Sequence, residues 1–92
     1  MKLTIVFNGG LEFLFKGETL KYETEKKMSL KDLILDLKTR IDKPHLFVGD
    51  GDSVRPGILV LINDVDYELL NGTEYELKDG DQIIFISTLH GG

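Results

Sequence analysis

The first 25 residues show a two-residue alternation of apolar and polar side chains that is broken once by a glycine turn. The apolar positions of the first alternating stretch are Leu3, Ile5 and Phe7. This period predicts a half-buried strand that ends at the turn over residues 8–10. Residues 11–15 are apolar and ambiguous, whereas residues 19–24 alternate again. We therefore expect residues 1–25 to form an antiparallel hairpin with a long loop.

Apolar residues then recur at helical spacing, which puts one apolar stripe on one face of a helix. The stripe consists of Leu30, Leu33, Ile34, Leu37 and Ile41. Ser29, with Asp32 three residues later, matches a capping box, and Pro44 stops the helix beyond Lys43. The pattern predicts one amphipathic helix of about 13 residues, with Leu33 and Ile34 in the core.

The second half of the chain reads as short extended segments separated by turns. After a loop over residues 45–56, the continuous apolar run at residues 58–62 is typical of a strand buried at the centre of a sheet. A short extended segment at 65–70, a brief strand or turn at 75–77 and a final strand at 82–87 follow.

This order of elements predicts an α+β fold of the β-grasp, ubiquitin-like class, with a mixed sheet of four to five strands wrapped on one main helix. In the final strand, Ile83 and Phe85 would face the helix, and Ile84 and Ile86 would face away from it. Ile84 and Ile86 would then form an apolar surface patch that partners use, or would be buried under residues 63–78.

Length and composition predict one globular domain over residues 1–92, with a C-terminal Gly-Gly tail. No apolar run reaches the length of a membrane span, and the N-terminal segment is too short for a secretory signal, so we expect no membrane partner. Because the chain has no cysteine, a cytoplasmic location is the natural expectation, with the nucleus as a further compartment.

Charge is distributed unevenly along the chain. The net charge is −5, which argues against direct binding of nucleic acid. Residues 1–46 carry nine basic and seven acidic side chains, whereas residues 47–92 carry two basic and nine acidic ones. A partner that binds the tail would therefore present a basic surface there, unless the acidic half is only a solvated surface.

Catalytic and metal-binding signatures are missing from the sequence. There is no cysteine or phosphate-binding loop, and His45 and His90 lie far apart in the chain. The carboxylates at residues 50, 52, 79 and 81 belong to Asp-Gly-Asp turns and lack the bidentate acid of a calcium loop. We expect no catalytic residues, no metal and no bound cofactor.

The sequence ends on Gly91-Gly92, directly after the predicted final strand. Because glycine has no Cβ, such a tail can enter a narrow channel and act as the substrate of another protein's active site. Terminal glycines also arise by chance or by engineering, so this expectation holds only if the printed end is the native one.

Several segments together carry a resemblance to a known family. They are residues 7–11 (FNGGL), 53–58 (SVRPGI), 61–64 (LIND) with 66–69 (DYEL), 77–81 (LKDGD) and the final hexapeptide 87–92 (STLHGG). The chain closely resembles the ubiquitin-related modifiers, which are eukaryotic sulfur carriers and protein modifiers of the β-grasp superfamily. It departs from their pattern at Tyr67, where tryptophan is usual.

The resemblance implies that an E1-like enzyme uses ATP to adenylate the carboxylate of Gly92 and then converts it to a thiocarboxylate. The sulfur would serve 2-thiolation of the wobble uridine of cytosolic tRNA by a separate thiolase complex, and the activated tail would also be joined to lysines of target proteins. Residues 88–91, Thr88, Leu89, His90 and Gly91, would guide the tail. Arg55 would contact a partner or pair with Asp50 or Asp52.

Two alternatives remain open from the sequence. A sulfur carrier for molybdopterin or thiamine synthesis would share the fold and the Gly-Gly end, although the Ser-Thr-Leu-His lead-in argues against it. A non-covalent ubiquitin-like interaction module would not need a free Gly92.

Overall fold

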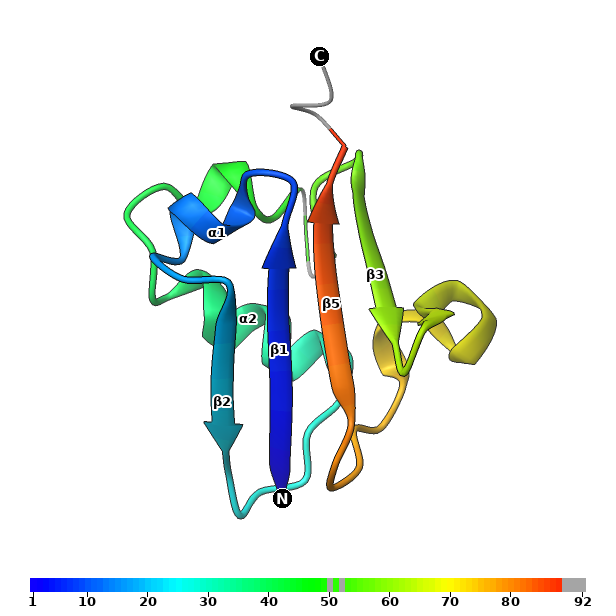
Figure 1. Cartoon of the computed structure of the whole chain (residues 1–92). Helices are drawn as coiled ribbons and strands as arrows, with labels where there is room; N and C mark the ends of the chain where they lie inside the picture. Colours follow the sequence, from blue (N-terminus) through cyan, green and yellow to red (C-terminus); the bar gives the residue numbers. More distant parts are fainter. Residues whose placement is uncertain (50, 52, 89–92) are drawn as a thin grey trace.

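The first and last strands of the chain lie side by side at the centre of one sheet (Figure 1). The computed structural model describes residues 1–49, 51 and 53–88. Its strands are β1 (Lys2–Asn8), β2 (Thr19–Glu23), β3 (Ile58–Ile62), β4 (Val65–Asp66) and β5 (Gln82–Ser87). Their order is β2-β1-β5-β3-β4, with β1 parallel to β5 and the other neighbours antiparallel. This mixed sheet, with one main helix, confirms the predicted β-grasp fold.

The main helix, α2 (Leu30–Lys38), lies on one face of the sheet (Figure 1) and begins at the predicted capping box. The Asp32 backbone N–H donates to the Ser29 hydroxyl over 3.1 Å, and the Ser29 N–H donates to the Asp32 carboxylate over 3.0 Å. The bond from the Ser29 backbone to the Asp32 carboxylate, and after it the Ser29 side chain, lower the pKa of Asp32 below its ordinary value. Leu33 and Ile34 are fully buried, as predicted.

The predicted end of this helix is wrong. α2 stops at Lys38 because both the backbone N–H and the hydroxyl of Thr39 donate to the Asp36 carbonyl, which tightens the last turn. Ile41, which the helical pattern included, lies beyond the helix but still packs against the core.

Short helices occupy several of the predicted loops. They are α1 (Leu11–Leu14), η1 (Pro44–Leu46), η2 (Tyr67–Leu70) and η3 (Gly72–Glu74). The extended segment predicted at 65–70 is correct only for its first two residues, which form β4. Residues 75–77, predicted as a brief strand or turn, contain one antiparallel bridge between Glu76 and Ser29.

β3 is not the central strand that its continuous apolar run predicted. It lies between β5 and the two-residue β4, and its side chains alternate between the core and the opposite face of the sheet. Ile58, Val60 and Ile62 are buried, whereas Leu59 is 49% exposed. The run is apolar throughout because both faces of β3 belong to apolar surfaces, one internal and one exposed.

Four phenyl rings pack together beneath the end of the sheet where β5 finishes. Phe7 stacks on Phe15 with ring centroids 4.0 Å apart, and Phe47 meets both Phe15 and Phe85 edge-on at 5.0 and 5.2 Å. Phe47 comes from the segment predicted as a loop and is fully buried. The cluster gives the carboxyl end of β5 a rigid base.

At the other end of β5, the side chain of Asp81 is the centre of a hydrogen-bond network. The sequence assigned Asp81 only to a turn and did not predict this network. Its carboxylate is buried and accepts hydrogen bonds from the Asn63 amide over 2.8 Å, the Tyr75 hydroxyl over 3.0 Å and the Lys78 N–H over 2.8 Å. These three donors offset the cost of burying the carboxylate.

Candidate functional site at the carboxyl end of β5

The residue that follows β5 is held firmly to the body of the protein. Both the backbone N–H and the hydroxyl of Thr88 donate to the Gly57 carbonyl, over 2.8 and 2.6 Å. Thr88, predicted as a tail residue, is therefore the anchor at which the tail leaves the sheet. Leu89, His90, Gly91 and Gly92 lie outside the described residues, so their predicted roles stay predictions.

Gly9 also lies very close to the end of β5, against the backbone of Ser87. Its φ is +72°, and a Cβ placed on it would lie 2.1 Å from the carbonyl oxygen of Ser87. Only glycine fits both the left-handed backbone and this distance. The turn after β1 thus packs directly against the last residue of β5, a role that the sequence pattern did not reveal.

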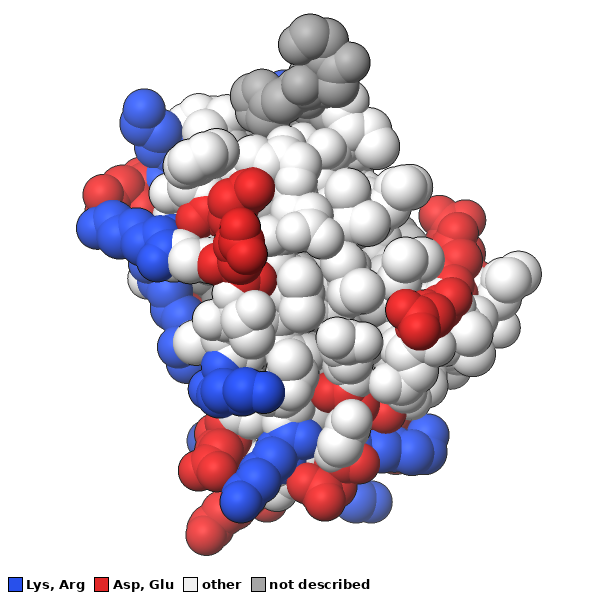
Figure 2. All heavy atoms as spheres, in the orientation of Figure 1, with Lys and Arg blue, Asp and Glu red and all other residues white. Residues whose placement is uncertain are grey.

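The face of the sheet opposite α2 carries an apolar surface that leads to this point. It consists of Val6, Leu59, Leu61, Ile84 and Ile86, which we call the outer-face patch. The strand register joins its members: Ile84 pairs with both Val6 and Leu61, and Ile86 pairs with Leu59. Figure 2 shows this face, where uncharged surface extends over the sheet towards the end of β5 and charged side chains lie mainly at the sides and the opposite end.

The predicted orientation of β5 is confirmed by burial. Ile83 and Phe85 are fully buried, whereas Ile84 and Ile86 are half-buried beside the exposed Leu59. The alternative, burial under residues 63–78, is wrong, because η2 lies at the β4 edge of the sheet and η3 contacts α2 (Figure 1).

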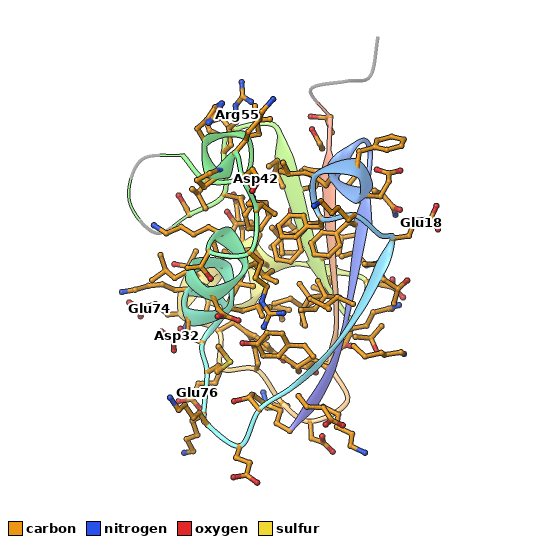
Figure 3. The ribbon with its side chains drawn as sticks, turned by 90° about the vertical axis from the view of Figure 1, so that its left-hand side faces the viewer. Glu18, Asp32, Asp42, Arg55, Glu74 and Glu76 are labelled. Atoms are coloured by element: carbon orange, nitrogen blue, oxygen red, sulfur yellow. The ribbon has the colours of Figure 1, made fainter. Side chains whose placement is uncertain are left out.

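Arg55 lies at the same end of the molecule but on the side of α2 (Figure 3). It lines a pocket of about 840 Å³ together with Lys38 and His45, so the structure does not place it with Ile84 and Ile86. Arg55 has no ion pair with any described residue. The predicted partners Asp50 and Asp52 lie outside the described residues.

The described residues contain no group of three His, Cys, Asp or Glu side chains arranged to hold a metal ion. Within the same part of the chain, no helix has the length and apolar character needed to cross a membrane. What the described residues do provide at the end of β5 is an anchor, a rigid aromatic base and an apolar face.

A mixed five-stranded sheet on one main helix, with the glycine-ended tail following its central strand, defines a ubiquitin-like β-grasp protein. Residues 2–92 match the family model described as Urm1 (Ubiquitin related modifier). The chain belongs to the ubiquitin-related modifier family, whose members are ubiquitin-like modifiers and sulfur carriers.

Similar proteins cover essentially the whole chain. The ubiquitin-related modifier 1 homolog of Dictyostelium discoideum is 50% identical over all of both chains, and human ubiquitin-related modifier 1 is 45% identical over all of this chain and 96% of its own. The solution structure of Urm1 from Trypanosoma brucei has a TM-score of 0.84 and 43% identity, covering 99% of this chain and 95% of that one. A chain in the crystal structure of the Amycolatopsis orientalis BexX/CysO complex has a TM-score of 0.73 and 25% identity, covering 98% and 99%.

Proposed function

We propose that this protein is a sulfur carrier and protein modifier whose reacting group is the carboxylate of Gly92. An E1-like enzyme binds the body, receives the tail and supplies the ATP site, so the protein acts as a co-substrate and not as an enzyme. The observation that carries the proposal is the anchor of Thr88 on Gly57, at the end of the central strand and beside the outer-face patch. Membership of the ubiquitin-related modifier family supports it.

The chemistry begins with a carboxylate, which is a poor electrophile until one of its oxygens becomes part of a good leaving group. Adenylation with ATP forms an acyl phosphate bond to AMP and releases pyrophosphate. A persulfide sulfur then attacks the carbonyl carbon, AMP leaves, and a thiol cleaves the sulfur–sulfur bond to free the thiocarboxylate. The tail keeps this labile sulfur covalently attached between active sites.

Two uses of the activated tail follow. The thiocarboxylate delivers sulfur to a tRNA thiolase complex that modifies the wobble uridine of cytosolic tRNA in the cytoplasm. Alternatively, a lysine amine of a target protein attacks the activated carbonyl and forms an amide bond to Gly92. The negative charge of this chain fits both uses, because partners supply the RNA surface and the nucleophile.

The decisive measurement is the intact mass of the protein purified from its native cell. We expect a species in which one oxygen is replaced by sulfur, and fragmentation should place the change at Gly92. In vitro, incubation with the E1-like enzyme of the tRNA pathway, ATP and a persulfide donor should produce the same mass change.

A variant that lacks only Gly92 is the matched control, and it should keep its fold while losing all activation. If only the activating enzymes of molybdopterin or thiamine synthesis modify the tail, the tRNA assignment is wrong. If removal of Gly92 leaves the cellular function intact, the protein is a non-covalent interaction module.

A further inference from the structure

The outer edge of the sheet at β2 is open. Hydrogen bonds from Phe7 N–H to the Glu18 carbonyl and from Thr24 N–H to the Met1 carbonyl fix the pairing of β1 with β2. In this register the backbone groups of residues 18, 20, 22 and 24 face β1, and those of residues 19, 21 and 23 face outward. No described residue bonds to these outward groups. A row of free N–H and C=O groups can therefore pair with an added strand.

Two adjoining hollows lie beside this edge. The first, of about 310 Å³, is lined by Phe15, Leu20 and other residues, and the second, of about 360 Å³, by an apolar set that includes Phe13. The apolar residues of the second hollow are Phe13, Leu14, Ile41 and Leu46. Phe13 is 83% exposed, the most exposed large apolar side chain among the described residues. Lys16 and Arg40 line both hollows, so the two hollows adjoin at these side chains, and we call the pair the groove.

The groove is basic and lies in the half of the chain, residues 1–46, where basic side chains outnumber acidic ones. Lys16, Arg40 and Lys43 line it, against the single carboxylate of Asp42. Arg40 is already bound to Asp36 over 3.2 Å, but Lys16 and Lys43 have no ion pair with any described residue. In Figure 3, which faces this edge, Glu18 points away from α2.

The backbone of Lys16 has a left-handed conformation, which glycine and asparagine adopt more readily than lysine. Its φ is +59°, in the left-handed region where glycine or asparagine is usual at the end of a helix. Lysine is therefore an unusual residue at this position, and its side chain lines both hollows.

We propose that the β2 edge and this groove bind an extended segment of a partner protein that has apolar side chains flanked by acidic residues. The segment adds a strand to β2 through the outward groups of Thr19, Lys21 and Glu23, its apolar side chains enter the hollows, and its carboxylates face Lys16 and Lys43. The surface is separate from the outer-face patch, because it lies at the edge of the sheet and on the side of α2.

A direct test uses nuclear magnetic resonance titration with a capped heptapeptide that has a Val-Ile-Val core and two glutamates at each end. We expect shifts of the amides of Thr19, Lys21 and Glu23, and weaker binding as salt rises. A peptide with lysines in place of the glutamates should not bind. A peptide N-methylated at alternate core residues should also fail, because it cannot donate to the strand ladder.

Matched charge variants separate a specific site from general electrostatics. Lys16→Glu should weaken binding about tenfold or more, whereas Lys26→Glu, the same charge change at an exposed lysine outside the groove, should change it less than about twofold. Removing residues 89–92 should leave peptide affinity unchanged, so this test does not depend on the proposed function of the tail.

Three results would overturn the proposal. The peptide could shift the outer-face patch and leave β2 unaffected, the two lysine variants could weaken binding equally, or the protein could pair with a second copy through β2. Sedimentation at increasing concentration detects the last of these.

Discussion

At the scale of single residues, Gly9 shows how one missing Cβ positions the start of the tail. Gly9→Ala forces a methyl group towards the Ser87 carbonyl and strains a backbone with φ +72°. We expect the free energy of unfolding to fall by more than about 1 kcal/mol, measured by chemical denaturation.

Gly17→Ala is the control, because nothing lies within 4 Å of a Cβ at that position and its φ is not left-handed. That change should cause no loss of stability. Equal losses at Gly9 and Gly17 would contradict the close contact with Ser87.

Tyr22 gives the protein a defined response to alkaline pH. Burial, and then its 2.6 Å hydrogen bond to Asp36, raises the pKa of Tyr22 to about 12 from about 10. Because the folded pKa is the higher one, this stabilisation is complete below pH 10 and is lost as the pH rises towards 12.

We expect Tyr22→Phe to flatten the fall in unfolding free energy over this pH range, measured by denaturation at several pH values. Some fall should remain, since burial also raises the pKa of Tyr67 and Tyr75. The same slope in both proteins would show that Tyr22 titrates as it does in the unfolded chain.

At the scale of elements, α2 depends on its capping box. Ser29→Ala removes the acceptor of the Asp32 N–H, and we expect it to lower the unfolding free energy by about 1 kcal/mol. Ser29→Asp should retain most of the stability, because aspartate also caps helices well.

The lowered pKa of Asp32 adds a pH signature to the same change. Its contribution is present at neutral pH and is lost as the pH falls below the ordinary value of 3.8. Ser29→Ala keeps the backbone bond, which is the larger cause of the lowered pKa, and removes only the contribution of the hydroxyl. Its cost should therefore be slightly smaller in acid than at neutral pH. A cost that does not change with pH would indicate that the Ser29 hydroxyl does not contribute to the lowered pKa of Asp32.

The elements that could be predicted from the sequence are those defined by local signals. Alternation located β1, a short apolar run located β5, and Ser29 with Asp32 located the start of α2. The end of α2 could not be predicted, because the Thr39 turn has no glycine and the nearest strong signal is Pro44. The position of β3 was wrong because an apolar run cannot tell a central strand from one that has an exposed apolar face.

The candidate site also has features that local sequence patterns predicted and features that they did not. Alternation was enough to predict that Ile84 and Ile86 face away from the helix. The bond of Thr88 to Gly57 joins residues 31 positions apart, and the approach of Gly9 to Ser87 joins the two ends of the chain. Such contacts depend on strand order, which no local pattern encodes.

At the scale of the whole molecule, the outer-face patch is the surface that we expect to recognise the activating enzyme. Leu59→Glu puts a charge on an exposed position of the patch, so the fold should survive while kcat/KM for activation falls by about tenfold or more, mainly through KM.

Leu69→Glu is the matched control, because Leu69 is 79% exposed and lies on η2, outside the patch. It should activate at the normal rate. Equal activity of the Leu59 and Leu69 variants would place the recognition surface elsewhere.

The parallel pairing of β1 with β5 also determines how the protein responds to mechanical force. β5 is hydrogen-bonded on both sides, to β1 and to β3, and the tail is the segment of chain that follows it. A pull on the tail, opposed at the N-terminus, loads both sets of bonds in shear at once, so they resist together and do not open one after another. In a single-molecule stretching experiment, the domain should therefore withstand high tension before it yields, whereas traction across the strands should open it readily.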